Sequence, residues 1–180
     1  MYKASGNIAI RDFTIDDVAR KVQWINDPEN NGYLHYDIPL SIEKTWIWFY
    51  GKDNSTRADC VIEYDGVPVG LIGLLAIDRN SRKAEYYTSM GEPAYKRKGV
   101  ASAATALILD YAFVDLALNK VYLNVDAENL AACALYEKAG FTCEGLFRQE
   151  LLFHGRLVDR KRYAMLKDEW ERRRAEHGKR

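Results

Sequence analysis

The order of strand-like and helix-like segments predicts one mixed domain of the α/β or α+β class, spanning residues 1–180. Apolar runs flank Asp65-Gly66, and two more flank His154-Gly155, so each pair is expected to form a β-hairpin. Between the hairpins the pattern alternates strand, helix, strand and helix. A chain of 180 residues, 48% of them hydrophobic and 29% charged, can bury a substantial core.

The first half of the chain contains both kinds of segment. Alternating polarity predicts a strand over Asn7–Phe13, and Thr14–Asp17 resembles a capping box that begins a helix. Asp27–Gly32 breaks this helix, and Ser41 is expected to cap a second one. The strands of the first hairpin are expected at Ala58–Tyr64 and Val67–Ile77.

The second half is expected to contain four strands, two long helices and a charged tail at residues 168–180 that resembles a frayed helix. The strands are Ala84–Met90, Lys120–Val125, Cys143–Phe153 and Leu157–Leu166. One helix runs from Gly99 to about Leu116, and the other runs from Asn129 to Ala139 and ends at Gly140.

Charge and cysteine content exclude several classes of protein. The 26 basic residues balance 26 acidic ones, so no nucleic-acid partner is expected. The cysteines Cys60, Cys133 and Cys143 lack metal-ligand spacing, which predicts reduced thiols, no metal and a cytoplasmic location. Met1–Asn7 has no apolar signal segment, and Val67–Ile77 is too short to cross a bilayer, so no membrane partner is expected.

The turn Tyr95–Ser102 is the strongest candidate for an anion-binding site. It carries Lys96, Arg97 and Lys98, and it joins a strand to a helix that begins near Gly99. Backbone N–H groups and a helix N-terminus that converge on one point suit a pyrophosphate. A single glycine fits neither the dinucleotide-binding nor the P-loop pattern. A solvated basic turn is the alternative.

Asn129 and Tyr136 lie seven residues apart, which places them on one face of a helix. An amide can hold a ligand rich in amide groups, and a phenol two turns away can donate a proton to a leaving thiolate. The alternative is an asparagine that caps the helix and a tyrosine of the core.

Together these segments resemble the GNAT family of N-acetyltransferases. Lys96-Arg97-Lys98-Gly99-Val100-Ala101 is similar to that family's acyl-CoA loop, Q/R-x-x-G-x-G/A, with a lysine in first position. Asn129–Phe141 is similar to its pattern N-x-x-A-x-x-x-Y-x-K-x-G-F. The resemblance extends from Ile8 to Met165. The run Glu144–Asp159 is similar to the branch that contains ribosomal-protein, polyamine and amino-sugar acetyltransferases.

The resemblance implies a mostly antiparallel seven-stranded sheet, splayed between two parallel strands and flanked by helices. Acetyl-CoA would bind as co-substrate between the strands Ala84–Met90 and Lys120–Val125. Backbone N–H groups near Met90 and Gly91 would polarise its thioester carbonyl. The turn would hold the pyrophosphate and Asn129 the pantetheine arm. The remaining cofactor-binding residues would be Lys96, Arg97, Lys98, Gly99, Val100, Ala101 and Ser102.

Two residues are the catalytic candidates. The resemblance implies that Tyr136 protonates the departing thiolate of CoA. An ammonium group has no lone pair, so a base must first take a proton from the acceptor. Glu85 is the first candidate for that base, and the alternative is a cross-strand partner of a lysine or arginine. His35 and Asp126 are weaker candidates.

The acceptor is expected to be a small-molecule amine, either a polyamine or an amino sugar. The pocket would come from the aromatic first third of the chain, with Trp24 and Trp46 in the core. Its candidates are Trp24, Asn26, Asp27, Tyr33, His35, Tyr36, Trp46 and Trp48. Aromatic faces with a few acids suit a sugar ring or a cation.

Several alternatives remain open at this stage. The acceptor could be a ribosomal protein N-terminus, or the chain could be an acyl-CoA sensor without turnover. A nicotinamide-dependent oxidoreductase is a third reading. A homodimer is a possible assembly. The basic runs Arg172–Arg174 and Gly178–Arg180 suit either a contact with RNA or a solvated tail.

Overall fold

The computed structural model describes residues 1–177, and in that range it contains one eight-stranded sheet. The strands are β1 (Tyr2–Ser5), β2 (Ile8–Asp12), β3 (Ala58–Tyr64), β4 (Val67–Asp78), β5 (Lys83–Met90), β6 (Lys120–Asp126), β7 (Thr142–Phe153) and β8 (Arg156–Leu166). Their order is β1-β2-β3-β4-β5-β6-β8-β7. β5 and β6 pair in parallel over three residue pairs, from Lys83–Lys120 to Glu85–Tyr122. The expected mostly antiparallel sheet with one parallel pair is confirmed, with eight strands rather than seven.

Helices occupy most of the remaining chain. They are α1 (Val18–Asn26), α2 (Pro28–Asn31), α3 (Ile42–Gly51), α4 (Val100–Asp110), α5 (Leu130–Ala139) and α6 (Lys167–His177). Short turns of helix, η1 (Ile15–Asp17) and η2 (Pro93–Tyr95), precede α1 and the basic turn. A π-helical turn, η3 (Tyr111–Asp115), extends α4, so the long helix predicted to end near Leu116 is confirmed. The charged tail is helical through His177, and Gly178–Arg180 lies outside the described residues.

The chain folds into two compact units that alternate along the sequence. The first comprises Met1–Leu75 and Tyr87–Ile108, and the second comprises Ala76–Tyr86 and the chain from Leu109 onward. The chain passes between the units inside β4, β5 and α4, so no linker separates them. Each unit is therefore built from segments that are distant in sequence.

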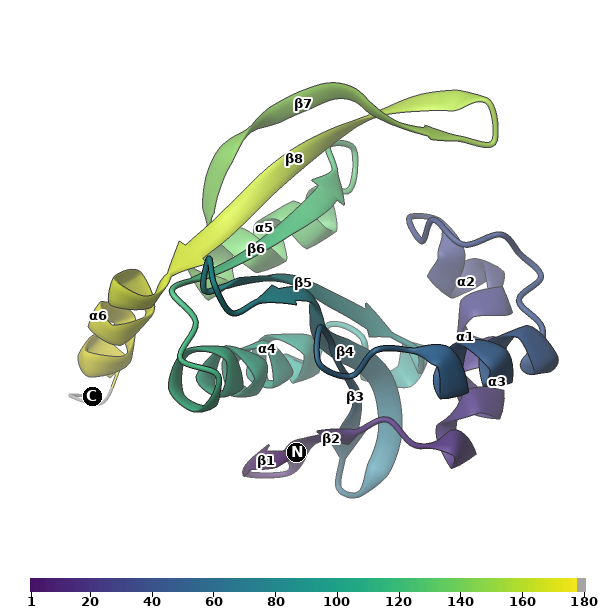
Figure 1. Ribbon diagram of the computed structural model, residues 1–180, viewed down its shortest axis with the longest axis horizontal. Helices are drawn as coiled ribbons and strands as arrows, with labels where there is room; N and C mark the ends of the chain where they lie inside the picture. The colour runs from purple at the N-terminus through teal and green to yellow at the C-terminus, as the bar shows by residue number, and fades with distance from the viewer. Residues whose placement is uncertain (178–180) are drawn as a thin grey trace. The chain divides into compact units, whose positions relative to one another are not determined.

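The first unit packs α1 and α3 against one another and holds a buried apolar cluster (Figure 1). The cluster contains Phe13, Val18, Trp24, Val61 and Leu71. These residues come from β3, β4, α1 and the segment after β2, because the alternation of each strand and the 3.6-residue period of α1 turn one apolar face inward.

An arginine joins the edge of this unit to its first helix. Arg11 on β2 donates to both carboxylate oxygens of Asp17, at 2.7 and 2.9 Å, and to Glu63 on β3 at 2.7 Å. The Asp17 carboxylate also accepts from the N–H of Thr14 at 2.8 Å. Burial alone would raise the pKa of Asp17, but these donors more than offset it, and the pKa is lowered.

The second unit is built around β6, which lies between the start of β5 and β8. β7 and β8 form the long hairpin drawn in green and yellow in Figure 1. Its register shifts twice, so the strands carry bulges that bend the hairpin. Tyr163 on β8 is fully buried, and its hydroxyl donates to Glu137 on α5 at 2.7 Å. This bond fixes α5 against the sheet.

Local signals account for most element boundaries. Ser41 accepts from the N–H of Lys44 at 3.1 Å, as expected of an N-cap, and Gly140 ends α5 in the left-handed conformation at φ 97°. β1 was not anticipated, although Gly6-Asn7 between two short runs is a hairpin signal. The expected break at Asp27–Gly32 contains α2, because the side chain of Asp27 caps a turn that begins with Pro28.

We expect Asp17→Asn to lower the free energy of unfolding by about 2 kcal/mol, because the Arg11 guanidinium loses one of its two anionic partners. The lowered pKa of Asp17 implies stability that is present above pH 4 and lost as the pH falls through the folded pKa. Urea denaturation at pH 3 and pH 7 measures both effects. The exposed neighbour Asp16 is the control: Asp16→Asn should change stability little, and an equal loss in both variants would contradict the account.

Candidate active site

The candidate residues fall in both units. Met90, Gly91 and the turn residues 96–102 belong to the first unit, whereas Glu85, Asn129 and Tyr136 belong to the second. The candidate residues are therefore divided between the two units.

The basic turn has the geometry of a helix start that follows a tight loop. Arg97 and Gly99 have positive φ values of 62° and 81°. The N–H of Ala103 donates to the carbonyl of Gly99 at 3.0 Å, so α4 takes its first hydrogen bond from that glycine. The N–H groups of residues 100–102 lie in the first turn, which has no intrahelical acceptors. This end of α4 can therefore receive an anion.

The segment that follows β5 is held tightly. The N–H groups of Gly91 and Glu92 both donate to the carbonyl of Val69 on β4, at 2.9 and 3.1 Å. The expectation that the Gly91 N–H polarises a thioester carbonyl needs correction, since that group already has an acceptor. Gly91 has a different role: a β-carbon there would collide with the ring of Trp24.

Asn30 on α2 links this segment to the basic turn. Its Nδ2 donates to the carbonyl of Gly91 at 2.8 Å and to that of Trp24 at 3.2 Å. Its Oδ1 accepts from Lys96 Nζ at 2.6 Å. One side chain thus holds the end of β5, α1 and the first residue of the turn, and the Lys96 ammonium is directed to α2.

Asn129 and Tyr136 lie on one helix, α5, as the spacing predicts. Asn129 is its N-cap, and its Oδ1 accepts from the N–H of Ala132 at 3.1 Å. This is the structural alternative named above, and it leaves the two Nδ2 hydrogens available to a ligand. Tyr136 is 8% exposed and packs edge-on against Tyr86 and Phe141.

Burial raises the pKa of Tyr136 to about 12, and the neighbouring Cys133 adds to the effect. The phenol therefore stays protonated throughout the physiological range. A thiolate of ordinary pKa, near 8.5, is the weaker base by about 3.5 units, so complete proton transfer is uphill by about 5 kcal/mol. Tyr136 is thus suited to hydrogen-bond a developing thiolate.

Glu85 on β5 meets an amide rather than a cation. Asn124 on β6 donates its Nδ2 to Glu85 Oε1 at 2.9 Å, and Asn124 Oδ1 accepts from Arg162 Nε at 3.1 Å. Arg162 also lies 5.0 Å from the ring of Tyr122. The hydrogen bond from Asn124 therefore orients the Glu85 carboxylate without pairing it directly with a cation. A base needs a carboxylate that is held in place and can still accept a proton. Asp126, the weaker candidate, lies 3.5 Å from Arg160 in an ion pair.

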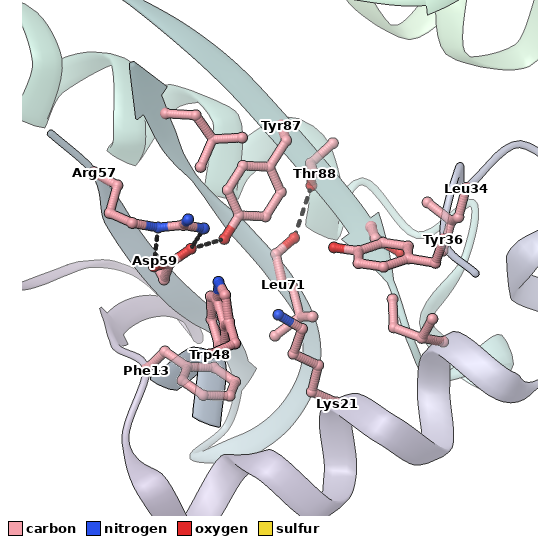
Figure 2. A pocket seen from close by; sticks show the side chains of 13 residues that line it. Phe13, Lys21, Leu34, Tyr36, Trp48, Arg57, Asp59, Leu71, Tyr87 and Thr88 are labelled. Atoms are coloured by element: carbon pink, nitrogen blue, oxygen red, sulfur yellow. Dashed lines mark hydrogen bonds and ion pairs between the residues drawn. The ribbon is translucent and has the colours of Figure 1, made fainter. Parts of the chain in front are cut away.

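The first unit also encloses a cavity of about 170 Å³ (Figure 2). Its walls come from α1, α3, the segment after α2, and strands β3, β4 and β5. The polar side chains in the wall are Lys21, Tyr36, Arg57, Asp59, Tyr87, Thr88 and Ser89. Ser89 directly precedes Met90, so the cavity borders the segment in which the thioester site is expected.

Asp59 organises the polar side of this cavity. Its side chain is 3% exposed and accepts from Arg57 twice at 2.7 Å, from Lys52 at 3.1 Å and from the Tyr87 hydroxyl at 2.9 Å. Burial would raise the pKa of Asp59, but the cations outweigh it and the pKa is lowered. Burial, reinforced by Asp59, raises the pKa of Tyr36 and Tyr87. Both tyrosines therefore remain neutral.

Lys21 is the unusual residue of the cavity. It is 8% exposed, and its Nζ lies 3.4 Å from the ring centroid of Trp48 (Figure 2). None of the described residues accepts a hydrogen bond from it. Burial lowers its pKa from 10.5 to about 8, with Arg57 and Lys52 contributing in the same direction and Asp59 opposing them. At pH 7 the group is still largely protonated.

The aromatic residues expected around an acceptor divide into three groups. Tyr36 and Trp48 do line the cavity. Trp24 is in the core, as expected, with its Nε1 donating to Glu92 at 2.9 Å. Trp46 was expected in the core but is 46% exposed, because α3 turns Thr45 and Phe49 inward instead.

Sequence reasoning missed the charged half of the cavity. A lysine on an amphipathic helix is normally solvated, so nothing in the pattern marked Lys21. Asp59 and Tyr87 stand on strands whose inward positions otherwise read as apolar. Asn26, another candidate, pairs with the backbone of Leu40 at 2.9 and 2.7 Å and has a structural role.

Within residues 1–177, no group of three or more His, Cys, Asp or Glu side chains is placed to hold a metal ion, and no helix is long and apolar enough to cross a membrane.

The fold and the candidate residues of each unit indicate a class of protein. A parallel strand pair, a basic turn that begins a helix, and an asparagine and a tyrosine two turns apart are the features that the resemblance to the GNAT family predicts. A family model described as acetyltransferase (GNAT) domain matches residues 7–142. This chain belongs to the GNAT family.

Two of the names that the curated relatives carry specify an acceptor. Spermidine N(1)-acetyltransferase of Escherichia coli K12 is 41% identical over 95 residues, 53% of this chain and 50% of that protein. The chain thus matches about half the length of that relative. The Vibrio cholerae enzyme of the same name is 36% identical over 118 residues, covering 66% of this chain and 68% of that one. Putative ribosomal N-acetyltransferase YdaF of Bacillus subtilis is 36% identical over 126 residues, covering 70% and 67%.

Solved structures agree with the family. The crystal structure of spermidine N-acetyltransferase from Vibrio cholerae in complex with CoA and spermine superposes with a TM-score of 0.84 at 26% identity. The superposition covers 93% of this chain and 99% of that one. The expected GNAT fold is confirmed, and the oxidoreductase reading is set aside, since a dinucleotide fold requires a parallel sheet.

We expect Lys21→Met to raise the free energy of unfolding at pH 7. The pKa of about 8 implies a cost of about 3 kcal/mol for holding the charge in the folded state, partly offset by about 1–2 kcal/mol of attraction to Trp48. The sign follows from the lowered pKa: the cost accumulates as the pH falls from 10.5 to 8 and then stays constant.

Chemical denaturation of both proteins at pH 7 and pH 10.5 measures this difference. A gain of about 1 kcal/mol at pH 7 that vanishes at pH 10.5 is expected. Lys44→Met, on the exposed face of α3, is the control and should be neutral at both values. Destabilisation at both pH values would show that the ammonium is satisfied in the folded state.

Proposed function

We propose that this chain is an acetyl-CoA-dependent N-acetyltransferase that acetylates the primary amine of a small molecule, with polyamines as the acceptor class. The observation that carries the proposal is the GNAT match across residues 7–142, which spans the basic turn, Asn129 and Tyr136. The names of the E. coli and Vibrio cholerae relatives support polyamines. A cytoplasmic location and a homodimer stay predictions.

The co-substrate would be held by groups that each unit offers separately. The first turn of α4 would receive the pyrophosphate, with Arg97 and Lys98 adding positive charge. Lys96 would act indirectly, since Asn30 holds its ammonium. In the second unit Asn129 would donate Nδ2 to a carbonyl of the pantetheine arm. Met90, rather than Gly91, remains the candidate donor to the thioester carbonyl.

The chemical step needs a free amine and a stabilised thiolate. The amine nitrogen attacks the thioester carbon, the C–S bond breaks, and the thiolate leaves. Tyr136 would donate a hydrogen bond to the sulfur as charge develops on it, which lowers the barrier without complete proton transfer. Glu85, oriented by Asn124, would accept the proton of the amine directly or through water.

A protein that binds acyl-CoA as a sensor, without turnover, is the alternative that is not an enzyme. Acyl-CoA binding alone does not require a protonated phenol or a free carboxylate, and this chain has both. Acetylation of a ribosomal N-terminus is the second enzymatic candidate, since one relative is named for it. An acetylation assay distinguishes the sensor and the ribosomal acetyltransferase from a polyamine acetyltransferase.

The first test measures release of CoA thiol from acetyl-CoA with spermidine, spermine, an amino sugar and a ribosomal N-terminal peptide. We expect turnover with a polyamine, and Tyr136→Phe should lower kcat about 100-fold while the Kd for acetyl-CoA changes less than about threefold. Turnover with the peptide alone would replace the polyamine. Binding of acetyl-CoA without release of thiol from any acceptor would favour the sensor.

The pH profile tests the role of Tyr136 further. Because its pKa is about 12, the phenol does not ionise in the working range. The ratio of wild-type kcat to that of Tyr136→Phe should therefore stay constant from pH 6 to pH 10. A ratio that falls between pH 7 and pH 9 would show that the phenol ionises in that range and would contradict its raised pKa.

A third variant tests the base. Glu85→Gln should lower kcat/KM for the amine about 10–100-fold at pH 7, and the deficit should shrink toward pH 10, where the acceptor is already deprotonated. Glu144→Gln, which removes a surface partner of Lys120, is the control and should leave kcat/KM unchanged. A deficit that is equal at all pH values would assign Glu85 a structural role.

A further inference from the structure

The cavity of the first unit contains more positive than negative charge. Lys21 and Arg57 supply two cations to its wall, Asp59 is the one anion there, and Lys52 pairs with Asp59 without lining the cavity. That carboxylate is fully used, because it accepts from Arg57, Lys52 and the Tyr87 hydroxyl. Its lone pairs are therefore not available to accept from Lys21 or from a ligand, although its charge still acts on the ammonium.

Lys21 points into the cavity with its hydrogen-bond donors unfilled. Among the described residues it has ring contacts with Trp48, Phe13 and Tyr36 at 3.4, 5.7 and 6.0 Å, but no acceptor. The Nζ atom is not sealed from solvent: its three N–H donors face the cavity, where water or a ligand can accept from them. None of the described residues provides that acceptor, so the site can take an acceptor group from a ligand.

The aromatic rings of the cavity also favour an anionic ligand over a cationic one. Faces of tryptophan and tyrosine attract cations, and an empty cage of this kind would suit an ammonium ligand. Here Lys21 already occupies the face of Trp48. A second ammonium would have to displace it and would face Arg57, so a cation is the wrong ligand for this cavity.

We propose that this cavity binds a carboxylate group through the ammonium of Lys21, with the apolar wall holding a short hydrocarbon chain of the same ligand. A cavity of about 170 Å³ accommodates a few heavy atoms. Leu34, Leu71 and Leu75 line its apolar part, and the Tyr36 hydroxyl is a second donor. This site goes beyond the proposed function and does not depend on turnover.

The carboxylate can come from two sources. It can be part of the acceptor, since Ser89 in the cavity wall adjoins Met90, where the thioester is expected. It can also belong to a separate small acid. The chemistry of the site is the same in both cases.

The first experiment measures binding without acetyl-CoA. Butyrate is titrated by calorimetry at pH 7 into wild type, Lys21→Met and the control Lys44→Met, with butyramide and butylamine as ligands of similar size. We expect saturable binding of butyrate to wild type and Lys44→Met, at least tenfold weaker binding to Lys21→Met, and at least tenfold weaker binding of butyramide. Equal affinity of Lys21→Met, or tighter binding of butylamine than of butyrate, would overturn the proposal.

The pH dependence of butyrate binding is a second readout. Affinity should fall at least tenfold between pH 7 and pH 9.5 as Lys21 loses its proton. The groups that face it are Asp59, whose pKa is lowered, Tyr36 and Tyr87, whose pKa values are raised, Arg57, whose pKa is raised, and Lys52, which pairs with Asp59. An affinity that is unchanged at pH 9.5 would contradict the role of Lys21.

Turnover then distinguishes the two sources. Putrescine and ornithine are the same diamine without and with a carboxylate. A higher kcat/KM for ornithine that disappears in Lys21→Met assigns the carboxylate to the acceptor. A response of putrescine turnover to butyrate in wild type but not in Lys21→Met assigns it to a separate ligand. If no amine is acetylated, the proposed function fails, while the titrations still decide the carboxylate site.

Discussion

The carboxylate of Asp59 is the interaction on which the first unit depends. It accepts hydrogen bonds from Arg57, which directly precedes β3, from Lys52, which directly follows α3, and from the Tyr87 hydroxyl on β5. Its own backbone carbonyl accepts from Phe13 N–H at 2.9 Å, which fixes the end of β2 beside it. Three parts of the chain, at residues 13, 52–59 and 87, therefore meet at one buried anion, and each of them contributes to the walls of the cavity. A glycine at position 73 leaves room for the Tyr87 ring that completes the arrangement.

The same anion explains why Lys21 stands apart. A buried carboxylate can accept from a limited number of donors, and three of them surround Asp59 already. Lys21 is close enough to sense its charge but stacks on Trp48 instead. The Lys21 ammonium thus lowers the stability of the folded protein, but its position in the cavity wall allows it to contact a small molecule. Stability and binding make opposite demands on this position, as they commonly do at functional sites.

The fold could be predicted from sequence wherever a local rule decided the outcome. Asp65-Gly66, Ser41 and Gly140 mark a turn, an N-cap and a C-cap, and all three appear as expected. β1 was not predicted because its residues are mostly exposed and do not alternate between apolar and polar, although Gly6-Asn7 is a turn signal. Trp46 was misplaced because helical spacing says which residues share a face, but not which face is covered. Of the candidate site, the turn and the pair on α5 were found because they are contiguous. The cluster of Lys21, Arg57, Asp59 and Tyr87 was not, since it exists only after three segments have met.

Asn30 illustrates how chemistry can restrict a position that no pattern marks. Its head group offers hydrogens to the carbonyls of Gly91 and Trp24 on one side and an oxygen to the Lys96 ammonium on the other. An aspartate would serve the ammonium but leave two carbonyls without a donor, and a lysine or arginine would do the reverse. Only a side-chain amide carries donors and an acceptor on one planar group, and glutamine would reach one methylene too far. The identity of this residue is therefore dictated by its three neighbours, of which Gly91 and Trp24 accept through their backbone carbonyls and Lys96 donates through its side chain.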